Sequence, residues 1–475
     1  MAEFKLSNRV NPNKVFILRT SELEKRLDPF YYIPEIKELE DKVRTKDVKP
    51  LRHFVVSVSS GATPKTEEKE KYYSDKENGI PFLRVQNLSP TGILEYEDCK
   101  YINKETHEGY LKRSQVSGGD LLVKITGVGR MAVASVAPDD FIGNTNQHMV
   151  VIKTGNSEIS TILASYLNSD IGEKLASRRA TGGTRPALDY PALLSIPILF
   201  DEKILTITKN AVDAKNIKQN EAKELLASID DYLLKELGIT LPEKDNSLEN
   251  RIFTTSLNQI SGNRLDSNYY SSYNRKLLEA LNNSKYDLDF IKTNTTFIPG
   301  YAFSSNDYLN ESNCYLITIK NISKNEIKLN NVTYLPDNYF EIYKYYRIEK
   351  GDLLIAMTGA TIGKVGIYQK DEKALINQRN GILRPNKNLN TQYLLSLLNT
   401  SIYQELILKN SVGGAQPNIS ETDITKIKIP MPSPEKQSEI SYNIKELRKL
   451  AKQLERDANQ IMINAKAEVE TIILS

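Results

Sequence analysis

Two short fragments have the glycine spacing of nucleotide-binding loops. Residues 127–132 (Gly-Val-Gly-Arg-Met-Ala) fit a dinucleotide-binding turn, and residues 359–365 resemble a phosphate-binding loop. A dinucleotide site needs a helix directly after the turn, but residues 133–136 have the composition of a strand. The second fragment is one residue short between its glycines and has Val365 where a Ser or Thr would hold Mg²⁺. Neither fragment therefore predicts a nucleotide site.

Catalytic residue types are scarce elsewhere. Asp120 and Lys124 have the types of a nuclease site, but Asp352, their counterpart later in the chain, has no lysine at the same spacing. Three histidines and two cysteines are too few to predict a Ser-His-Asp site, a Cys-His site, a structural zinc site or a disulfide framework. No adenine-methylation signature is present, since residues 11–14 (Asn-Pro-Asn-Lys) predict only a turn. We therefore expect no enzyme, no catalytic residue, no metal and no cofactor in this chain.

Polar side chains of other types are, in contrast, grouped between the predicted strands. Arg, Lys, Gln, Asn and His hydrogen-bond to base edges or phosphates. The glycine pairs at 182–183 and 413–414 would let the backbone approach a phosphate closely, or they could form simple turns. The candidate DNA-binding residues are Arg84, Gln86, Asn87, Lys124, Thr126, Arg130, Gln147, His148, Thr184, Arg185, Thr318, Lys320, Asn321, Thr358, Lys364, Gln378, Arg379, Gln416 and Asn418.

These candidates belong to a long-range repeat. Residues 26–32 (Arg-Leu-Asp-Pro-Phe-Tyr-Tyr) return 238 residues later as Arg-Leu-Asp-Ser-Asn-Tyr-Tyr. Residues 119–123 (Gly-Asp-Leu-Leu-Val) return at 351–355, and Asn146-Gln147 returns 231 residues later as Asn377-Gln378. All matches keep their order, and the small drift of the offset fits a few short loop deletions. The pattern predicts two copies of one domain. The residues of the repeated motifs agree between the two copies, whereas the polar residues between the motifs differ.

Each copy has the pattern of a mixed α+β domain. Short apolar runs bounded by Gly, Pro and Asn predict strands, and a helix and a glycine-rich loop follow them. In copy one the predicted strands are 82–85, 121–126, 149–152 and 194–199, with a helix at 161–177 and a loop at 181–186. In copy two the corresponding helix is 391–409, the loop 412–417 and the last strand 426–431.

A long helix is predicted after each copy. In the second, Ser433, Pro434 and Glu435 form a helix start, and apolar residues then follow in steps of four and three, as in a coiled-coil seam. The first, roughly 201–237, has a less regular seam. Each would be on the order of 55–60 Å long. The predicted seam residues are Ile207, Ala211, Leu225, Ile229, Leu233, Ile440, Ile444, Leu447, Ala451, Leu454, Ala458 and Ile461. An antiparallel pair within one chain is the simplest arrangement, and a homodimeric coiled coil is the alternative.

Composition limits the protein class. The net charge is +3, with 63 basic and 60 acidic residues among 475, so any contact with nucleic acid must come from local clustering of charge. No apolar run approaches the roughly 20 residues of a membrane span, and the first residues lack the apolar core of a signal peptide. Two cysteines favour a reducing compartment. We expect a soluble cytoplasmic protein.

Two related domains on a rigid spacer suit a ligand with two sites at a fixed separation. Duplex DNA is such a ligand, because its major groove returns on one face every ~34 Å. Two domains with equal frames and different polar side chains would bind two unlike half-sites. A coiled-coil scaffold with two peptide- or glycan-binding domains is the alternative.

The chain resembles the specificity subunits of type I restriction–modification systems. The resemblance is carried by the repeated Gly-Asp-Leu-Leu strands and by the loops at 182–189 (Gly-Gly-Thr-Arg-Pro-Ala-Leu-Asp) and 413–420 (Gly-Gly-Ala-Gln-Pro-Asn-Ile-Ser). Residues 429–437 (Ile-Pro-Met-Pro-Ser-Pro-Glu-Lys-Gln), which lead into the heptad helix, complete it, and the likeness covers about residues 20–475. The family commonly has Glu-Gln where this chain has Glu-Lys-Gln.

The resemblance implies an α+β fold with two tandem target-recognition domains, two long antiparallel coiled-coil helices and internal pseudo-twofold symmetry. The expected segments are domain one at 1–200, a spacer helix at 201–240, domain two at 241–432 and a second spacer helix at 433–475. The implied partners are double-stranded DNA, two methyltransferase subunits and restriction subunits. S-adenosylmethionine would then bind the methyltransferase, and ATP and Mg²⁺ the restriction subunit.

Overall fold

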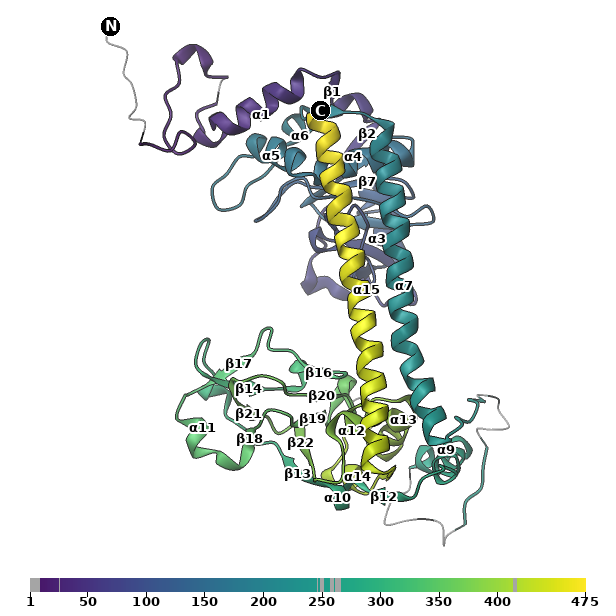
Figure 1. Ribbon diagram of the computed structural model, residues 1–475. Helices are drawn as coiled ribbons and strands as arrows, with labels where there is room; N and C mark the ends of the chain where they lie inside the picture. The colour runs from purple at the N-terminus through teal and green to yellow at the C-terminus, as the bar shows by residue number, and fades with distance from the viewer. Residues whose placement is uncertain are drawn as a thin grey trace. The chain divides into compact units, whose positions relative to one another are not determined.

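A computed structural model describes residues 9–24, 26–245, 247, 252–256, 260, 266–412 and 417–475. The chain forms two compact units (Figure 1): unit 1 contains Met1–Gln219 and Glu455–Ser475, and unit 2 is Asn220–Leu454. Helices and strands are mixed in both, which confirms the α+β class. The units divide the chain differently from the four expected segments, because both units include parts of the long helices. Those segment boundaries remain a prediction. None of the described helices is long and apolar enough to span a membrane.

Unit 1 is built on two sheets. The first has the antiparallel order β2-β10-β7-β8, and the second has the order β3-β5-β4-β9-β6, in which β4 and β9 are parallel. The strands are β1 (Val48–Pro50), β2 (Ser57–Ser60), β3 (Tyr73–Ser74), β4 (Ile80–Leu83), β5 (Lys100–Ile102), β6 (Gln115–Ser117), β7 (Leu121–Lys124), β8 (Ala134–Val136), β9 (Ile142–Thr145), β10 (Met149–Lys153) and β11 (Pro197–Leu199), the last paired with β1.

Unit 2 has two four-stranded sheets with corresponding pairings, and two two-stranded sheets, β12-β23 and β15-β16. One four-stranded sheet has the antiparallel order β13-β22-β19-β20, and the other has the order β17-β14-β21-β18, in which β14 and β21 are parallel. The strands are β12 (Leu288–Phe290), β13 (Thr295–Pro299), β14 (Cys314–Ile317), β15 (Ile322–Ser323), β16 (Glu326–Ile327), β17 (Thr333–Leu335), β18 (Arg347–Ile348), β19 (Leu353–Ala356), β20 (Val365–Ile367), β21 (Lys373–Ile376), β22 (Asn380–Pro385) and β23 (Lys428–Pro430).

Strand β7 shows why these apolar runs form buried strands. Successive side chains of a strand point to opposite faces. Leu121 and Val123 lie in a core shared with the helices, whereas Leu122 lies in a separate core between the two sheets. Because both faces are covered, the strand is a continuous apolar run. Leu353 and Leu354 of β19 divide between two cores of unit 2 in the same way.

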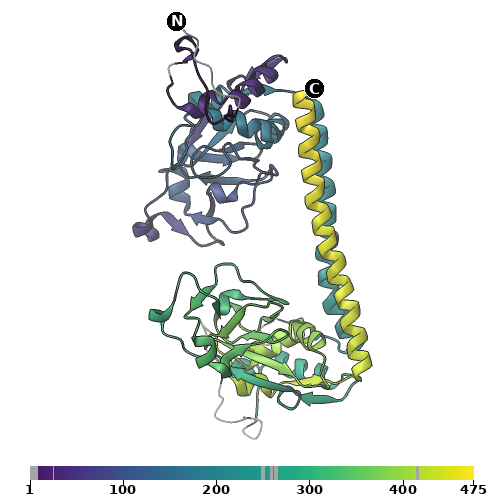
Figure 2. The ribbon, with the colours of Figure 1, turned by 60° about the vertical axis from the view of Figure 1, so that its left-hand side comes forward.

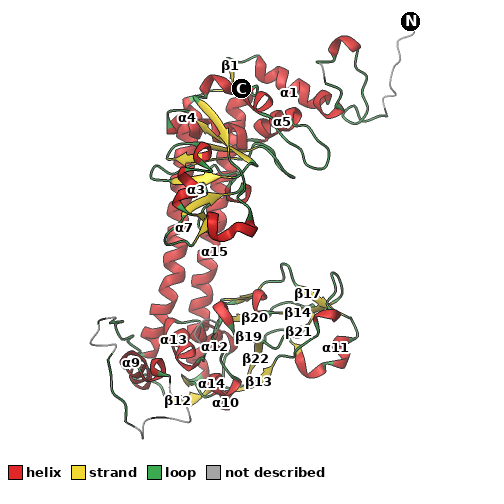
Figure 3. Cartoon of the chain, turned by 180° about the vertical axis from the view of Figure 1, so that it is seen from behind, coloured by secondary structure: helices red, strands yellow, loops and turns green. Residues whose placement is uncertain are grey.

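Of the remaining helices, α4 and α12 contact the sheets, whereas α1 and α9 pack mainly on other helices (Figure 3). The remaining helices are α1 (Pro34–Arg44), α2 (Lys69–Tyr72), α3 (Lys104–Glu108), α4 (Ser157–Asn168), α5 (Asp170–Arg179) and α6 (Tyr190–Leu194) in unit 1, and α9 (Ser272–Asn282), α10 (Ile291–Asn294), α11 (Tyr339–Ile342), α12 (Thr391–Leu398), α13 (Ser401–Asn410) and α14 (Glu421–Thr425) in unit 2.

The single helix predicted at 161–177 is wrong, because two helices occupy this segment. Ser169 has an extended backbone (ψ 159°), and its hydroxyl caps α5 by accepting a hydrogen bond from the amide of Gly172. The helix predicted at 391–409 is likewise divided, into α12 and α13. Part of the strand predicted at 194–199 is helix, because Asp189 caps α6 and only Pro197–Leu199 is strand.

The repeated Tyr-Tyr segment anchors the start of each unit. In unit 1 the guanidinium carbon of Arg178 lies 4.3 Å from the ring centre of Tyr31. In unit 2 the ammonium of Lys409 lies 3.4 Å from the ring centre of Tyr269. Both contacts place a cation from the end of a helix over an aromatic face. Arg264 and Leu265 of the second repeat lie outside the described residues.

Two long helices, α7 (Glu202–Leu237) and α15 (Pro434–Leu474), lie side by side in each unit (Figure 2). In unit 2 the end of α7 meets the start of α15, where Lys436 Nζ lies 2.8 Å from a carboxylate oxygen of Glu236. In unit 1 the start of α7 meets the end of α15, where Ile204 shares a core with Val469 and Ile473. The two helices are therefore antiparallel within each unit.

The predicted seam positions are shielded from solvent. Seven of them are buried: Ala211, Ile229, Leu233, Ile440, Ile444, Ala451 and Ala458. The other five are half-buried: Ile207, Leu225, Leu447, Leu454 and Ile461. Ile217, an apolar residue of α7 between Ala211 and Leu225, is 59% exposed. The first seam is irregular because half-buried Lys215 and Lys218 occupy this stretch of α7. Coiled-coil packing itself remains a prediction.

Candidate nucleic-acid interface

Backbone hydrogen bonds bring the candidate segments of unit 1 together. The amide of Asn146 donates to Leu83 O (3.2 Å), and that of Ile125 donates to His148 O (3.0 Å). The amide of Leu188 donates to Ile125 O (2.8 Å), which places the glycine-rich loop beside the end of β7. We call residues 84–87, 125–130, 146–148 and 181–188 loop cluster 1.

Unit 2 contains the corresponding bonds, with partners 231 to 234 residues later in the sequence. Asn377 N donates to Ile317 O (3.0 Å), Met357 N to Arg379 O (2.9 Å) and Ile419 N to Met357 O (3.0 Å). We call residues 318–321, 357–364, 377–379 and 412–419 loop cluster 2. Residues 413–416 within it, including the candidate Gln416, lie outside the described residues.

Asn87 and Asn321 are structural residues. Both are buried, with exposed fractions of 3% and 2%. The side-chain oxygen of Asn87 accepts from Arg84 N (2.8 Å), and its Nδ2 donates to Glu95 O (2.8 Å). Asn321 makes the corresponding bonds to Thr318 N and to Lys328 O. Because the protein itself uses these amide groups, we assign them the role of shaping the loops, and not the DNA contact that their residue type indicated.

Lys124 and Arg130 also point into the protein. Lys124 is 6% exposed, its Nζ donates to Val128 O (2.7 Å), and burial lowers its pKa. Arg130 donates to a carboxylate oxygen of Asp170 (2.7 Å) and to the carbonyl of Asn168 (2.8 Å), which fixes the start of α5. These two cations support the loop after β7, and we likewise assign them a structural role.

The other described candidates reach the surface at least in part. The exposed ones are Gln86, Gln147, Thr184, Arg185, Lys320, Gln378, Arg379 and Asn418, and the half-buried ones are Arg84, Thr126, His148, Thr318, Thr358 and Lys364. Two buried atoms, Arg84 Nε and Thr358 Oγ1, have no hydrogen-bond partner within the described part of the chain. Such atoms require a partner, and a water or a bound ligand supplies one.

Both clusters are basic. Loop cluster 1 contains three arginines, of which Arg130 is paired with Asp170 outside the cluster, and loop cluster 2 contains two lysines and one arginine. Neither cluster itself contains Asp or Glu. This is a local concentration of positive charge in a chain whose net charge is only +3. A basic surface formed by loops at strand ends attracts polyanions.

Each cluster borders one further segment that the sequence did not predict, at Thr63 in unit 1 and at Tyr301 in unit 2. In unit 2, Tyr301 N donates to Ile376 O (3.1 Å) and Gln378 N donates to Tyr301 O (3.0 Å), so Tyr301, 36% exposed, lies beside candidate Gln378. In unit 1, the hydroxyl of Thr63 donates to Gln147 Oε1 (2.7 Å). A repeated glycine, Gly61 or Gly300, precedes each segment; a Cβ there would collide with the backbone of the 145–147 or the 377–378 strand end. This repeated glycine is the sequence feature from which the two segments could have been predicted.

Among the described residues, no group of three or more His, Cys, Asp or Glu side chains is placed to hold a metal ion. The fragment resembling a dinucleotide-binding turn is followed by strand β8, as predicted. In the fragment resembling a phosphate loop, the amides of Gly359, Ile362 and Gly363 donate to protein carbonyls, so they do not form an open anion cradle.

Sequence comparison finds similar proteins for parts of the chain. Residues 273–462 match the model of the type I restriction modification DNA specificity domain. The type I restriction enzyme MjaVIII specificity subunit of Methanocaldococcus jannaschii is 27% identical over 170 residues, 35% of this chain and 40% of that protein. The EcoBI specificity subunit of Escherichia coli is 26% identical over 161 residues, 34% of this chain and 33% of that protein. The chain is thus aligned with two fifths or less of each relative.

Two solved structures are similar over most of the chain. A chain from a study of complex assembly and conformational transition of the type I R-M system covers 90% of this chain and 96% of its own length, with 15% identity and a TM-score of 0.47. The S subunit from M. genitalium covers 90% and 95%, with 12% identity and a TM-score of 0.37. The sequence matches carry this result: residues 273–462 match the specificity-domain model, and the resemblance of the chain to type I specificity subunits is confirmed.

Proposed function

We propose that this chain is the non-catalytic DNA-recognition subunit of a type I restriction–modification complex. Its two units are copies of one target-recognition domain related by pseudo-twofold symmetry. Loop cluster 1 contacts one half of a bipartite, asymmetric DNA site, and loop cluster 2 contacts the other half. The antiparallel helices α7 and α15 form the coiled-coil spacer that sets the gap between the halves.

The observation that carries this proposal is that the two loop clusters share the same backbone hydrogen bonds but present different side chains at the surface. Corresponding hydrogen bonds build both loop clusters, and both clusters contain three cations and no carboxylate. Their exposed or half-buried side chains differ: Gln86 corresponds to Lys320, and His148 to Arg379. Side chains of these types distinguish base edges in the major groove. A shared frame with different contacts fits two unlike half-sites.

The partners follow from the family. Two methyltransferase subunits and restriction subunits join this chain, which directs them to the DNA site. S-adenosylmethionine binds in the methyltransferase, and ATP and Mg²⁺ bind in the restriction subunit, so this chain needs no cofactor. The complex acts in the cytoplasm. The charged faces of α7 and α15 and the exposed flanks of the two units are the surfaces we assign to the methyltransferase.

Two measurements test the proposal. Single-molecule sequencing of DNA from cells that express this chain with its methyltransferase should show methylated adenines in both halves of one bipartite sequence. The affinity of the complex for that DNA should fall steeply with salt, with a log–log slope of roughly −0.9 per neutralised phosphate. A scaffold that binds peptides or glycans would produce no sequence-specific methylation and little salt dependence, and that result would overturn the proposal.

A further inference from the structure

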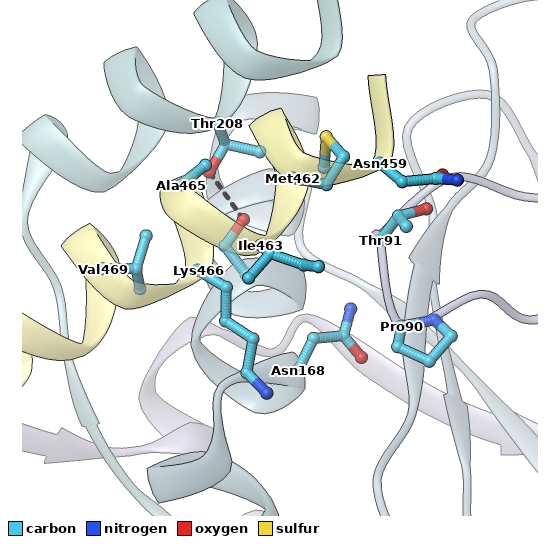
Figure 4. A pocket seen from close by; sticks show the side chains of 11 residues that line it. Pro90, Thr91, Asn168, Thr208, Asn459, Met462, Ile463, Ala465, Lys466 and Val469 are labelled. Carbon is cyan, nitrogen blue, oxygen red and sulfur yellow. Dashed lines mark hydrogen bonds between the residues drawn. The ribbon is translucent and has the colours of Figure 1, made fainter. Parts of the chain in front are cut away.

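A pocket of about 320 Å³ lies in unit 1 between the loop after β4, helix α4 and the two long helices (Figure 4). Its volume is at the lower end of the range of ligand pockets, roughly 300–1,000 Å³. The walls are largely apolar, and Met462, Ile463 and Val469 of α15 provide much of them. The rest of the lining is Pro90, Thr91, Ser165, Asn168, Thr208, Asn459, Ala465 and Lys466.

Most polar groups of the lining already have partners. The hydroxyl of Thr91 pairs with Ser89 Oγ (2.9 Å), and that of Ser165 pairs with Thr208 Oγ1 (2.8 Å). The amide of Asn168 is bonded to both backbone groups of Ala134. A hydroxyl oxygen with one hydrogen bond can still accept another. The pocket is therefore mainly apolar, and the hydroxyl oxygens in its lining can accept further hydrogen bonds.

In unit 2 the corresponding place is filled by the protein itself. Asn325 follows Asn321 at the distance at which Thr91 follows Asn87, and Ser396 corresponds to Ser165. Arg448 of α15 donates from Nη2 to Asn325 Oδ1 (2.7 Å) and to Ser396 Oγ (3.2 Å). Burial lowers the pKa of Arg448 to about 10, because its guanidinium is shielded from water. The loop and helix that line the pocket of unit 1 thus hold an arginine in unit 2.

We propose that the pocket of unit 1 receives an arginine side chain of the methyltransferase subunit. This inference rests on the proposed function, which supplies the partner. Ile463 lines the pocket and is 59% exposed, so the apolar lining reaches the protein surface, where a side chain of a partner can enter. The aliphatic stem of an arginine packs along such walls while its planar group donates several hydrogen bonds.

The charges at the pocket set the direction in which the bound arginine side chain points. Lys466 forms an ion pair with Asp170, and its ammonium lies at one end, near Asn168 (Figure 4). In the same view, Thr91 and Asn459 are drawn on the side of the pocket away from this ammonium. The guanidinium therefore points toward Thr91 and Asn459, away from the lysine, as Arg448 points toward Asn325 in unit 2.

Photo-crosslinking identifies the occupant. The full chain with benzoylphenylalanine at position 463 is assembled with its methyltransferase and irradiated, and the linked peptide is sequenced. We expect a methyltransferase peptide with an arginine close to the link, and changing that arginine to methionine should weaken assembly roughly tenfold or more. A link only to this chain, a link to a methyltransferase segment without arginine, or unchanged assembly of the methionine variant would overturn the inference.

A filled pocket gives a second test. Ile463→Trp should weaken methyltransferase binding by a similar factor, and Leu450→Trp is the matched control, since Leu450 is an exposed aliphatic residue of α15 that does not line the pocket. Equal losses in both variants would contradict the pocket. If the unchanged chain binds no methyltransferase, the proposed function itself fails. If it binds and the Ile463 variant binds equally well, only this inference fails.

Discussion

A buried carboxylate holds the N-terminal helix of unit 1 in place, and its removal has a calculable effect. Glu40 of α1 has a side chain that is 4% exposed and lies 2.5 Å from Arg178 Nη1 and 2.6 Å from Arg179 Nη2. Arg44 donates a further bond to it (2.9 Å). Burial alone would raise the pKa of Glu40, but the bonds to Arg179 and Arg44 and the charge of Arg178 outweigh burial and lower it to about 2.

The size of the effect follows from this pKa. A shift from 4.5 to about 2 corresponds to about 3 kcal/mol of stability at neutral pH. Glu40→Gln keeps the shape of the side chain but leaves two buried guanidinium groups without their carboxylate. At roughly 2–4 °C per kcal/mol for a unit of this size, the melting temperature of unit 1 should fall by about 6–12 °C.

Calorimetry of the full chain measures this fall, and hydrogen exchange of α1 and α5 shows that the affected transition belongs to unit 1. Glu38→Gln is the matched control, because Glu38 is exposed on the same helix. The lowered pKa also fixes the sign with pH. The stability from Glu40 is complete above its unfolded pKa of about 4.5 and is lost as pH falls toward 2. Equal melting temperatures of the two variants, or a difference that stays constant down to pH 2, would refute this account.

Three further predictions distinguish changes that alter the recognised DNA sequence from changes that alter the stability of the fold. Gln86→Ala should change the methylated sequence in one half-site and Lys320→Ala in the other, and methylome sequencing that shows both halves relaxed together would contradict two independent domains. Asn87→Ala should instead destabilise unit 1 by roughly 1–3 kcal/mol, because it leaves buried backbone groups unpaired, while urea unfolding registers the loss and the methylated sequence stays the same. Deleting one heptad from both α7 and α15 should change the gap between the halves and leave their letters unchanged, as the same sequencing would show.

The sequence predicted the arrangement of the loops well because it contains the arrangement twice. Residues 119–123 and 351–355 share a pattern, and their strands pair in the same order in both units. The apolar run at 121–126 predicted a strand, and β7 occupies residues 121–124 of it with a core on each face. Where the prediction failed, a single residue decided the structure: Ser169 ends one helix and caps the next, although the apolar pattern continues across it.

Residue type was a weaker guide to the contact surface. Asn87 and Gln86 are neighbours with similar amide groups, yet one is buried and the other exposed. Asn87 is buried because its amide donates to the carbonyl of Glu95. The position of that carbonyl is set by the tertiary structure and cannot be predicted from the sequence pattern. Arg130 was similarly placed on the DNA surface by its type, but Asp170, forty residues away in sequence, holds it.

The separation between buried and exposed amides has a functional consequence. Asn87 and Asn321 use both ends of their side chains to shape their loops, so the loop path depends on residues that the ligand does not contact. Gln86 and Lys320 stand next to them on the exposed side and differ between the units. If the proposed function holds, an exposed substitution there would change the hydrogen-bonding groups offered to DNA with little loss of stability, because surface substitutions usually alter stability by less than about 0.5 kcal/mol. A protein built this way can acquire a new target sequence through its exposed loop residues while the buried asparagines preserve the loop.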